Sequence, residues 1–225
     1  MYFSKFFSIV TLLMVTMSVA SAQQFKRNSA TVSSDVEMVP EFSRFELGES
    51  VMLFKGLPKV HEFGWRASIL HAWRMNEAKA PLYFHIGLEM HYNFAFNDEV
   101  NSYGETVDSE DKFLSVSIPL NLSENIRLSD HCCMELLTGL NIRINAIGFT
   151  QYSNQKVNYM SNGLAHRFLT GVNFGLGFNF GRNCVLYRHT MDCRDYFTSE
   201  VTRNGGEQFD GARLRHHSIS WGIMF

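Results

Sequence analysis

After its first 22 residues the sequence lacks any apolar run of the roughly 18 residues that a membrane-spanning helix needs. A helical membrane protein is therefore excluded. The chain also lacks an excess of basic residues, because 20 Lys and Arg stand against 22 Asp and Glu. Without a basic surface, a nucleic-acid partner is not expected. The length fits a single domain.

Cysteine is scarce as well, with Cys132, Cys133, Cys184 and Cys193 as the complete set. Their spacing contains neither a CxxC pair nor an accompanying HxxxH pair, so no zinc site and no other cofactor is predicted. An exported protein can form disulfides, and four cysteines allow three pairings that the spacing does not distinguish.

The one apolar stretch that is present lies at the N-terminus, from Ile9 to Val19, behind Lys5. Ala20-Ser21-Ala22 follows and matches the small-x-small pattern of a signal-peptide cleavage site. A membrane anchor is the alternative, but the stretch is short for a span. We expect residues 1–22 to be removed, which leaves a net charge of −3 from 19 basic and 22 acidic residues. No Cys follows the site to carry a lipid anchor.

Alternation of apolar and polar residues with a period of two dominates the rest of the chain. It predicts eight strands without helices between them, connected most simply as antiparallel hairpins. The predicted strands are 45–54, 63–74, 82–97, 113–122, 134–145, 168–181, 185–197 and 217–225. The facing of 45–54 stays open, because this segment ends in a continuous apolar run.

The predicted connections alternate in length, and every second one is shorter than its neighbours. In order they are roughly 55–62, 76–81, 98–112, 123–132, 148–166, 182–184 and 198–212. Transmembrane barrels show this alternation, with short periplasmic turns and longer extracellular loops.

The segment 168–181 indicates which face points inward. Its apolar face carries Val172, Phe174, Leu176 and Phe178, whereas the other face holds Gly171, Asn173, Gly175, Gly177, Asn179 and Gly181. An eight-stranded barrel has a lumen wide enough only for side chains, and small residues fit it. The apolar face then meets lipid, and closure removes the unpaired strand edges that lipid does not tolerate. A soluble exported barrel with its apolar face inside is the rival fold.

Aromatic residues cluster at both ends of the predicted strands. Trp65 and Trp73 lie eight residues apart on one apolar face, about 20 Å along the membrane normal for a tilt near 40°. This is close to the ~25 Å apolar band that aromatic girdles flank. The predicted fold class is therefore all-β: an eight-stranded antiparallel transmembrane barrel of outer-membrane type over 45–225, after a periplasmic segment 23–44.

With these strands identified, the chain resembles the PorT-like and OmpA/OmpX-like outer-membrane β-barrel families over roughly 45–225. The resemblance is carried by "KFLSVSIPLNLS", "MELLTGLNIRINA", "FLTGVNFGLGFNFG" and the final "SISWGIMF". It implies an outer-membrane location and insertion by the barrel-assembly machinery. The C-terminal assembly signal would comprise Ile219, Trp221, Ile223 and Phe225. Through the PorT-like family, it also implies a link to protein secretion.

Charged residues of both signs share the inward face and are expected to neutralise one another there. This polar cluster comprises Arg66, His85, Glu89, His91, Glu135, Arg143, Arg188 and Asp192. His85, Glu89 and His91 together suggest a metal or acid–base site. However, they spread over some 20 Å of strand, which favours a structural cluster over a metal site. Cys133 and Cys184 fall near one rim but are separated by a strand, about 10 Å apart, too far for a direct disulfide unless the turns bend inward.

An enzyme is not expected. His189 and the His217–Ser218 pair are the candidates for a rim-located lipid-modifying site, but adjacent strand residues point to opposite faces and no acidic group accompanies them. Wide pores need more strands than eight. The prediction is a structural or surface-interaction protein in contact with the lipid bilayer and lipopolysaccharide. The acidic loop 98–112 and the polar loop 148–166 are the expected contacts to an envelope protein. An accessory role in envelope assembly or secretion is the alternative.

Overall fold

The computed structural model describes residues 40–54, 61–77, 81–100, 106–152, 155–198, 201–202, 208–209 and 212–225. The predicted signal peptide 1–22 lies outside these residues, as does most of the segment 23–44. Both therefore stay predictions.

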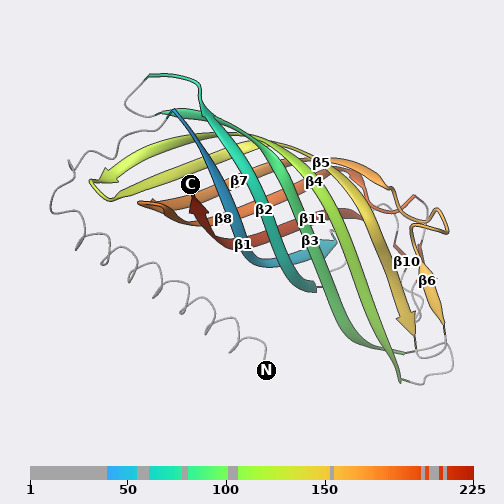
Figure 1. Cartoon of the computed structure of the whole chain (residues 1–225). Helices are drawn as coiled ribbons and strands as arrows, with labels where there is room; N and C mark the ends of the chain where they lie inside the picture. Colours follow the sequence, from blue (N-terminus) through green and yellow to red (C-terminus); the bar gives the residue numbers. More distant parts are fainter. Residues whose placement is uncertain are drawn as a thin grey trace.

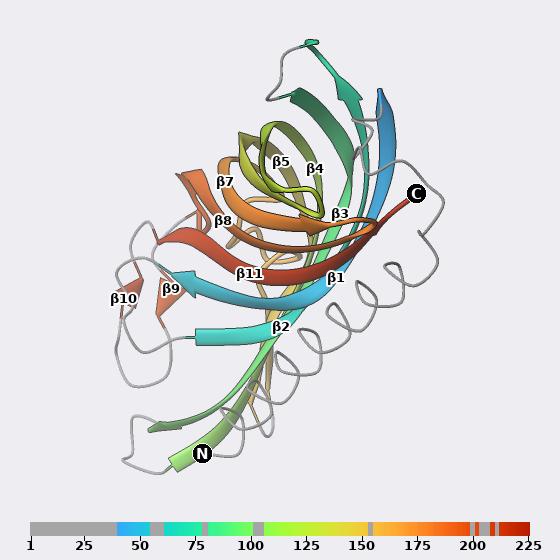
Figure 2. The same ribbon diagram turned by 90° about the vertical axis from the view of Figure 1, so that its left-hand side faces the viewer.

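Eight long strands form one closed antiparallel ring (Figure 1). They are β1 (Glu41–Phe54), β2 (His61–Arg74), β3 (Leu82–Val100), β4 (Thr106–Ser129), β5 (Cys132–Tyr152), β7 (Phe168–Phe180), β8 (Asn183–Asp195) and β11 (Arg213–Met224). Each pairs with the next, and β11 pairs with β1 from Arg44↔Met224 to Phe54↔Leu214. Figure 2 shows β8, β11, β1 and β2 side by side in this order. The predicted eight-stranded antiparallel barrel is confirmed.

Three short strands lie at one end of this ring. β6 (Lys156–Asn158) pairs with the last residues of β5, and β9 (Val201–Thr202) pairs with β10 (Gln208–Phe209) in the final connection. We call this end, where β1 finishes at Phe54, the loop end. The opposite end, with the two-residue turns 130–131 and 181–182, is the turn end. The chain's C-terminus lies at the turn end (Figure 1).

The strands β3, β4 and β5 are longer than the sequence predicted. β3 continues to Val100 and β4 begins at Thr106, so the predicted loop 98–112 is wrong for most of its length. The pairing from Phe94↔Lys112 to Val100↔Thr106 keeps the backbone groups of this acidic stretch hydrogen-bonded, which explains the extension.

Two further predicted loops contain strand residues. The predicted loop 123–132 is nearly all strand, since β4 runs to Ser129 and β5 starts at Cys132. The loop 148–166 begins within β5 and includes β6. At the loop end, β3, β4, β5 and β6 consequently extend beyond the other strands as a protruding sheet (Figure 1).

β1 begins at Glu41, so it includes the last four residues of the segment that was expected to precede the barrel. Its pairing with β2 starts at Glu41↔Trp73 and fixes the facing that the sequence left open. Arg44 and Glu46 point into the lumen, whereas Phe45 and Leu47 point out with 42% and 43% of their surface exposed.

The outer wall of the ring is largely apolar. Ile69 and Leu88 are each 52% exposed, and Leu140 is 57% exposed. Soluble monomers rarely expose contiguous apolar surface of more than a few hundred Å². This wall therefore matches a lipid-facing surface, and the facing predicted for the strands is correct. Among the described residues there is no helix long and apolar enough to cross a membrane.

Two residues placed on the inward face by their alternation lie elsewhere. Gly181 sits in the turn after β7 with φ of 60°, which a glycine adopts without strain. Arg194 is exposed, close to where the pairing of β8 with β11 shifts in register between Arg213 and Arg215. Gly177, in contrast, faces inward, and a Cβ there would lie 2.9 Å from Leu186 Cδ1.

Candidate functional site

The lumen holds the chemistry of this barrel, because alternation directs charged side chains from several strands into it. The described residues include four buried arginines, Arg44, Arg66, Arg143 and Arg188. Glu46, Glu89, Glu135 and Asp192 are buried among them. Buried charges persist in proteins only when they are paired and hydrogen-bonded.

Glu46 and Glu89 form the centre of this network. The guanidinium of Arg66 lies 2.6 Å from Glu46 Oε2 and 2.5 Å from Glu89 Oε2. Arg188 donates to the same oxygen of Glu89 at 2.5 Å from the other side of the ring. Side chains of β1, β2, β3 and β8 thus meet near the barrel axis and connect strands that do not pair directly.

Toward the turn end the network continues through Arg44. Its guanidinium holds both carboxylate oxygens of Glu135, at 2.6 and 3.2 Å, and lies 2.7 Å from Glu46. Asn179 donates to Glu135 at 3.3 Å. His85 Nε2 lies 2.7 Å from Ser123 Oγ and 4.0 Å from Glu135.

Toward the loop end the charges are joined by histidines. His91 Nε2 lies 2.7 Å from Glu89 Oε1, and its ring centroid is 4.7 Å from that of His216. Arg143 donates to Asp192 at 2.9 Å. No group of three or more His, Cys, Asp or Glu arranged to hold a metal occurs in the described part of the chain.

The predicted polar cluster is distributed along this network. All of its members lie buried on the inner wall: Arg66, His85, Glu89, His91, Glu135, Arg143, Arg188 and Asp192. Glu89 and His91 are in contact, but His85 belongs to the separate group around Glu135. Arg44 was missed because it precedes the predicted first strand. Glu46 was missed because the facing of that strand was open, although its alternation with Phe45 and Leu47 was a usable signal.

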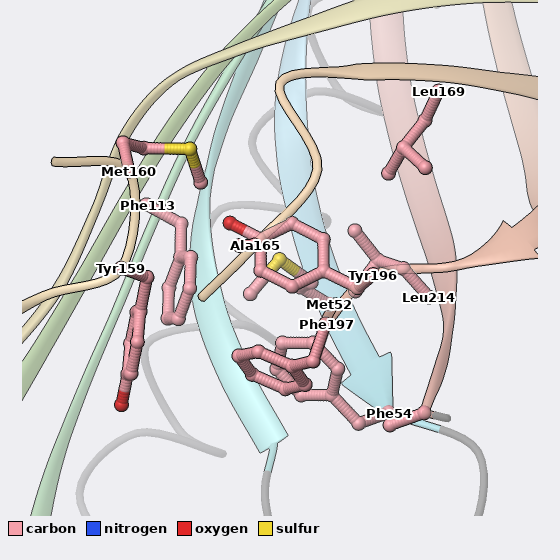
Figure 3. Packing of buried hydrophobic residues seen from close by; sticks show 11 residues of the cluster. Met52, Phe54, Phe113, Tyr159, Met160, Ala165, Leu169, Tyr196, Phe197 and Leu214 are labelled. Atoms are coloured by element: carbon pink, nitrogen blue, oxygen red, sulfur yellow. The ribbon is translucent and has the colours of Figure 1, made fainter. Parts of the chain in front are cut away.

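An aromatic plug lies in the lumen at the loop end. It comprises Met52, Phe54, Phe113, Tyr159, Met160, Ala165, Leu169, Tyr196, Phe197, Ala212 and Leu214, most of them labelled in Figure 3. The ring of Phe54 lies 5.5 Å from those of Tyr196 and Phe197, and the Phe113 ring stacks on Tyr159 at 6.0 Å. Part of the polar loop 148–166 therefore folds into the barrel mouth.

A smaller apolar layer lies at the turn end. Phe42, Ala72 and Tyr83 are buried there, with Met224 packed against them. The charged network is therefore enclosed between two apolar layers. All four cysteines are free, so the approach of Cys133 and Cys184 does not produce a disulfide. They flank Asn179 on the strand between them, in keeping with the separation expected from the sequence.

The residues suggested for an enzyme lie on opposite faces. His189 and His217 are on the outer wall with ring centroids 4.4 Å apart, whereas Ser218 is buried on the inner wall. The assembly-signal residues lie along β11: Ile223 is on the outer face, with Ile219 and Trp221 at alternating positions before it and Phe225 just after the strand. Their role in assembly stays a prediction.

Comparison with known proteins gives matches to solved structures only, since no family model and no curated protein matches this chain. Neisserial surface protein A shows 10% identity and a TM-score of 0.49, over 83% of this chain and 98% of that chain. The attachment invasion locus protein Ail of Yersinia pestis, bound to a heparin analogue, shows 13% identity and a TM-score of 0.42, over 83% of this chain and 100% of that chain. The outer membrane enzyme PagL shows 11% identity and a TM-score of 0.44, over 79% of this chain and 98% of that chain.

The assignment of an outer-membrane type of barrel rests on the molecule itself: a closed ring of eight strands, an apolar outer wall and a polar lumen. The PorT-like part of the resemblance stays a prediction.

Proposed function

We propose that this protein is an outer-membrane barrel with a filled lumen, whose role is structural or lies in contacts made at the cell surface. The observation behind this proposal is the filled interior. Charged side chains pair across the lumen, and a buried apolar cluster lies toward each end of it. A lumen filled in this way leaves the outer wall and the loop end as the surfaces available for function.

The short turns of transmembrane barrels face the periplasm, so the loop end would face the cell exterior. The protruding sheet of β3 to β6 then stands above the membrane. Lys112 pairs with Glu110 at 2.8 Å, and Lys156 Nζ lies 3.7 Å from the Phe149 ring centroid. These contacts order a mixed polar and aromatic surface, which we propose as the contact site for an envelope protein.

The test is to fractionate cells that express the full chain and to compare its gel mobility with and without boiling. The proposal predicts an outer-membrane band that shifts on boiling, because a closed barrel resists detergent unfolding. In planar bilayers the extracted protein should give no steady ion conductance. A soluble periplasmic protein without a shift would contradict the membrane location. A stable open channel would contradict the filled lumen.

A further inference from the structure

One region of the outer wall departs from its apolar character. On the loop-end half of β8 and β11, the outward positions carry His189, Arg213, Arg215 and His217. We call this group the basic strip. His217 and His189 pair directly across the two strands, and Arg215 lies two residues further along β11 on the same face. Below them, toward the turn end, the same face of β11 carries Ile219, Trp221 and Ile223.

The contacts within the basic strip do not use all of its hydrogen-bonding atoms. Tyr187 Oη lies 2.7 Å from His217 Nδ1, which orients the imidazole on the wall. Arg213 approaches Asp195 at 3.5 Å, with both side chains about half exposed. Arg215 Nε and His189 Nδ1 are buried atoms without a hydrogen-bond partner in the described part of the chain.

The height of the strip follows from strand geometry. Phe225 and His217 are eight residues apart, and at ~3.3 Å per residue with a tilt near 40° they are separated by about 20 Å along the barrel axis. Arg215 and Arg213 lie about 5 and 10 Å higher on the same reckoning. An apolar band of ~25 Å that starts near Phe225 therefore ends at Arg215. The two arginines stand where lipid headgroups begin.

We propose that the basic strip binds the phosphate of anionic lipids in the leaflet at the loop end. This inference rests on the proposed membrane location. Guanidinium groups match phosphate oxygens in charge and in bidentate geometry. The tyrosine–histidine pair just below supplies an amphipathic surface for the upper part of the acyl chains. Glu49, on the neighbouring strand opposite Ile219, lies below this level.

The experiment measures binding of phosphatidic acid to the detergent-extracted full chain by native mass spectrometry, with phosphatidylcholine as the uncharged reference. The test variant is Arg213→Gln with Arg215→Gln. The matched control is Arg127→Gln with Arg182→Gln, which removes two exposed arginines at the turn end, one of them also paired with an aspartate. We expect the test variant to bind phosphatidic acid about ten-fold more weakly, and the control to bind like the wild type.

Equal affinity of the test variant and the wild type would overturn the site. An equal loss in both variants would also overturn it, because net charge alone would then explain binding. All proteins are first checked for heat-modifiable mobility. If the barrels shift on boiling but the affinities are equal, the lipid site fails alone. If the wild type neither shifts nor enters the membrane fraction, the proposed function fails with it.

Discussion

Glu89 lies within hydrogen-bond distance of three basic side chains, Arg66, Arg188 and His91. These side chains come from three different strands, so one carboxylate connects both sides of the ring. A buried ion pair contributes little net stability compared with an apolar pair, but removal of one partner leaves the other charges uncompensated. At the residue scale, Glu89 is therefore the position where a single lost charge should matter most.

Glu89→Gln removes the carboxylate with almost no change in volume. We expect it to lower the free energy of unfolding by about 3–5 kcal/mol, because two buried arginines lose the negative charge that they share. Urea unfolding in phosphatidylcholine vesicles measures the change. Glu124→Gln, at an exposed position of β4, is the control and should change it by less than about 0.5 kcal/mol. Similar urea midpoints for the two variants would show that the network is not needed for stability.

Tyr196 in the aromatic plug gives a pH dependence. Burial raises the pKa of its phenol well above the usual value of 10, and the nearby Glu62 carboxylate acts in the same direction. Above pH 10 the unfolded chain loses this proton while the folded protein keeps it. The contribution of Tyr196 to stability is therefore complete below pH 10 and decreases as the pH rises above it.

Tyr196→Phe removes this dependence. Between pH 10 and 11 the wild type should lose up to about 1.4 kcal/mol relative to the variant, as measured by urea unfolding at each pH. Below pH 10 the difference in the free energy of unfolding between the two proteins should not change with pH. Parallel stability curves from pH 8 to 11 would mean that the phenol is accessible to water in the folded barrel.

At the scale of elements, the plug depends on β1 as well as on the connections. Phe54 is 4% exposed at the end of β1 and packs against Phe113, Tyr196 and Phe197. Phe54→Ala should lower the free energy of unfolding by about 3–5 kcal/mol, through lost burial and the cavity that remains. Leu128→Ala, which is 55% exposed near the turn end, serves as the control and should cost far less. Equal losses would show that residue 54 is no better packed than a surface position.

The strands were predictable because their alternation is a local property of the sequence. Leu136 and Leu140 alternate with Glu135 and Asn141, and this pattern alone sets the two faces of β5. The inward glycines likewise indicated a narrow lumen. The length of β3 and β4 was not predictable. Acidic residues are depleted in strands, so this stretch has the composition of a loop, and only the backbone pairing shows that it is strand.

The aromatic plug could not be predicted from the sequence, for a related reason. Tyr159 and Met160 lie in a turn-rich connection without any periodicity, and their burial depends on Phe113 and on the segment after β8. Contacts between connections far apart in the chain follow from closure of the ring, which no local pattern encodes. The same holds for Arg44, whose partner Glu135 is 91 residues away.

At the scale of the whole molecule, the barrel places polar groups inside and apolar groups outside. A soluble barrel has the reverse arrangement. Part of the driving force for folding therefore comes from the transfer of the apolar outer wall from water into lipid. Within the charged network four arginines face Glu46, Glu89, Glu135 and Asp192, and two further acids, Glu62 and Asp111, are buried as well. The outer wall of this barrel is therefore expected to meet acyl chains.

The three tryptophans of the chain test this claim without any substitution. Trp65 and Trp73 are 45% and 39% exposed on the outer wall, and Trp221 shares the outward face of β11. The measurement is quenching of their fluorescence in vesicles, by lipids with brominated acyl chains and separately by aqueous iodide. A wall in contact with acyl chains predicts strong quenching by the brominated lipids and weak quenching by iodide. Strong quenching by iodide with none from the brominated lipids would contradict it, because the wall would then face water.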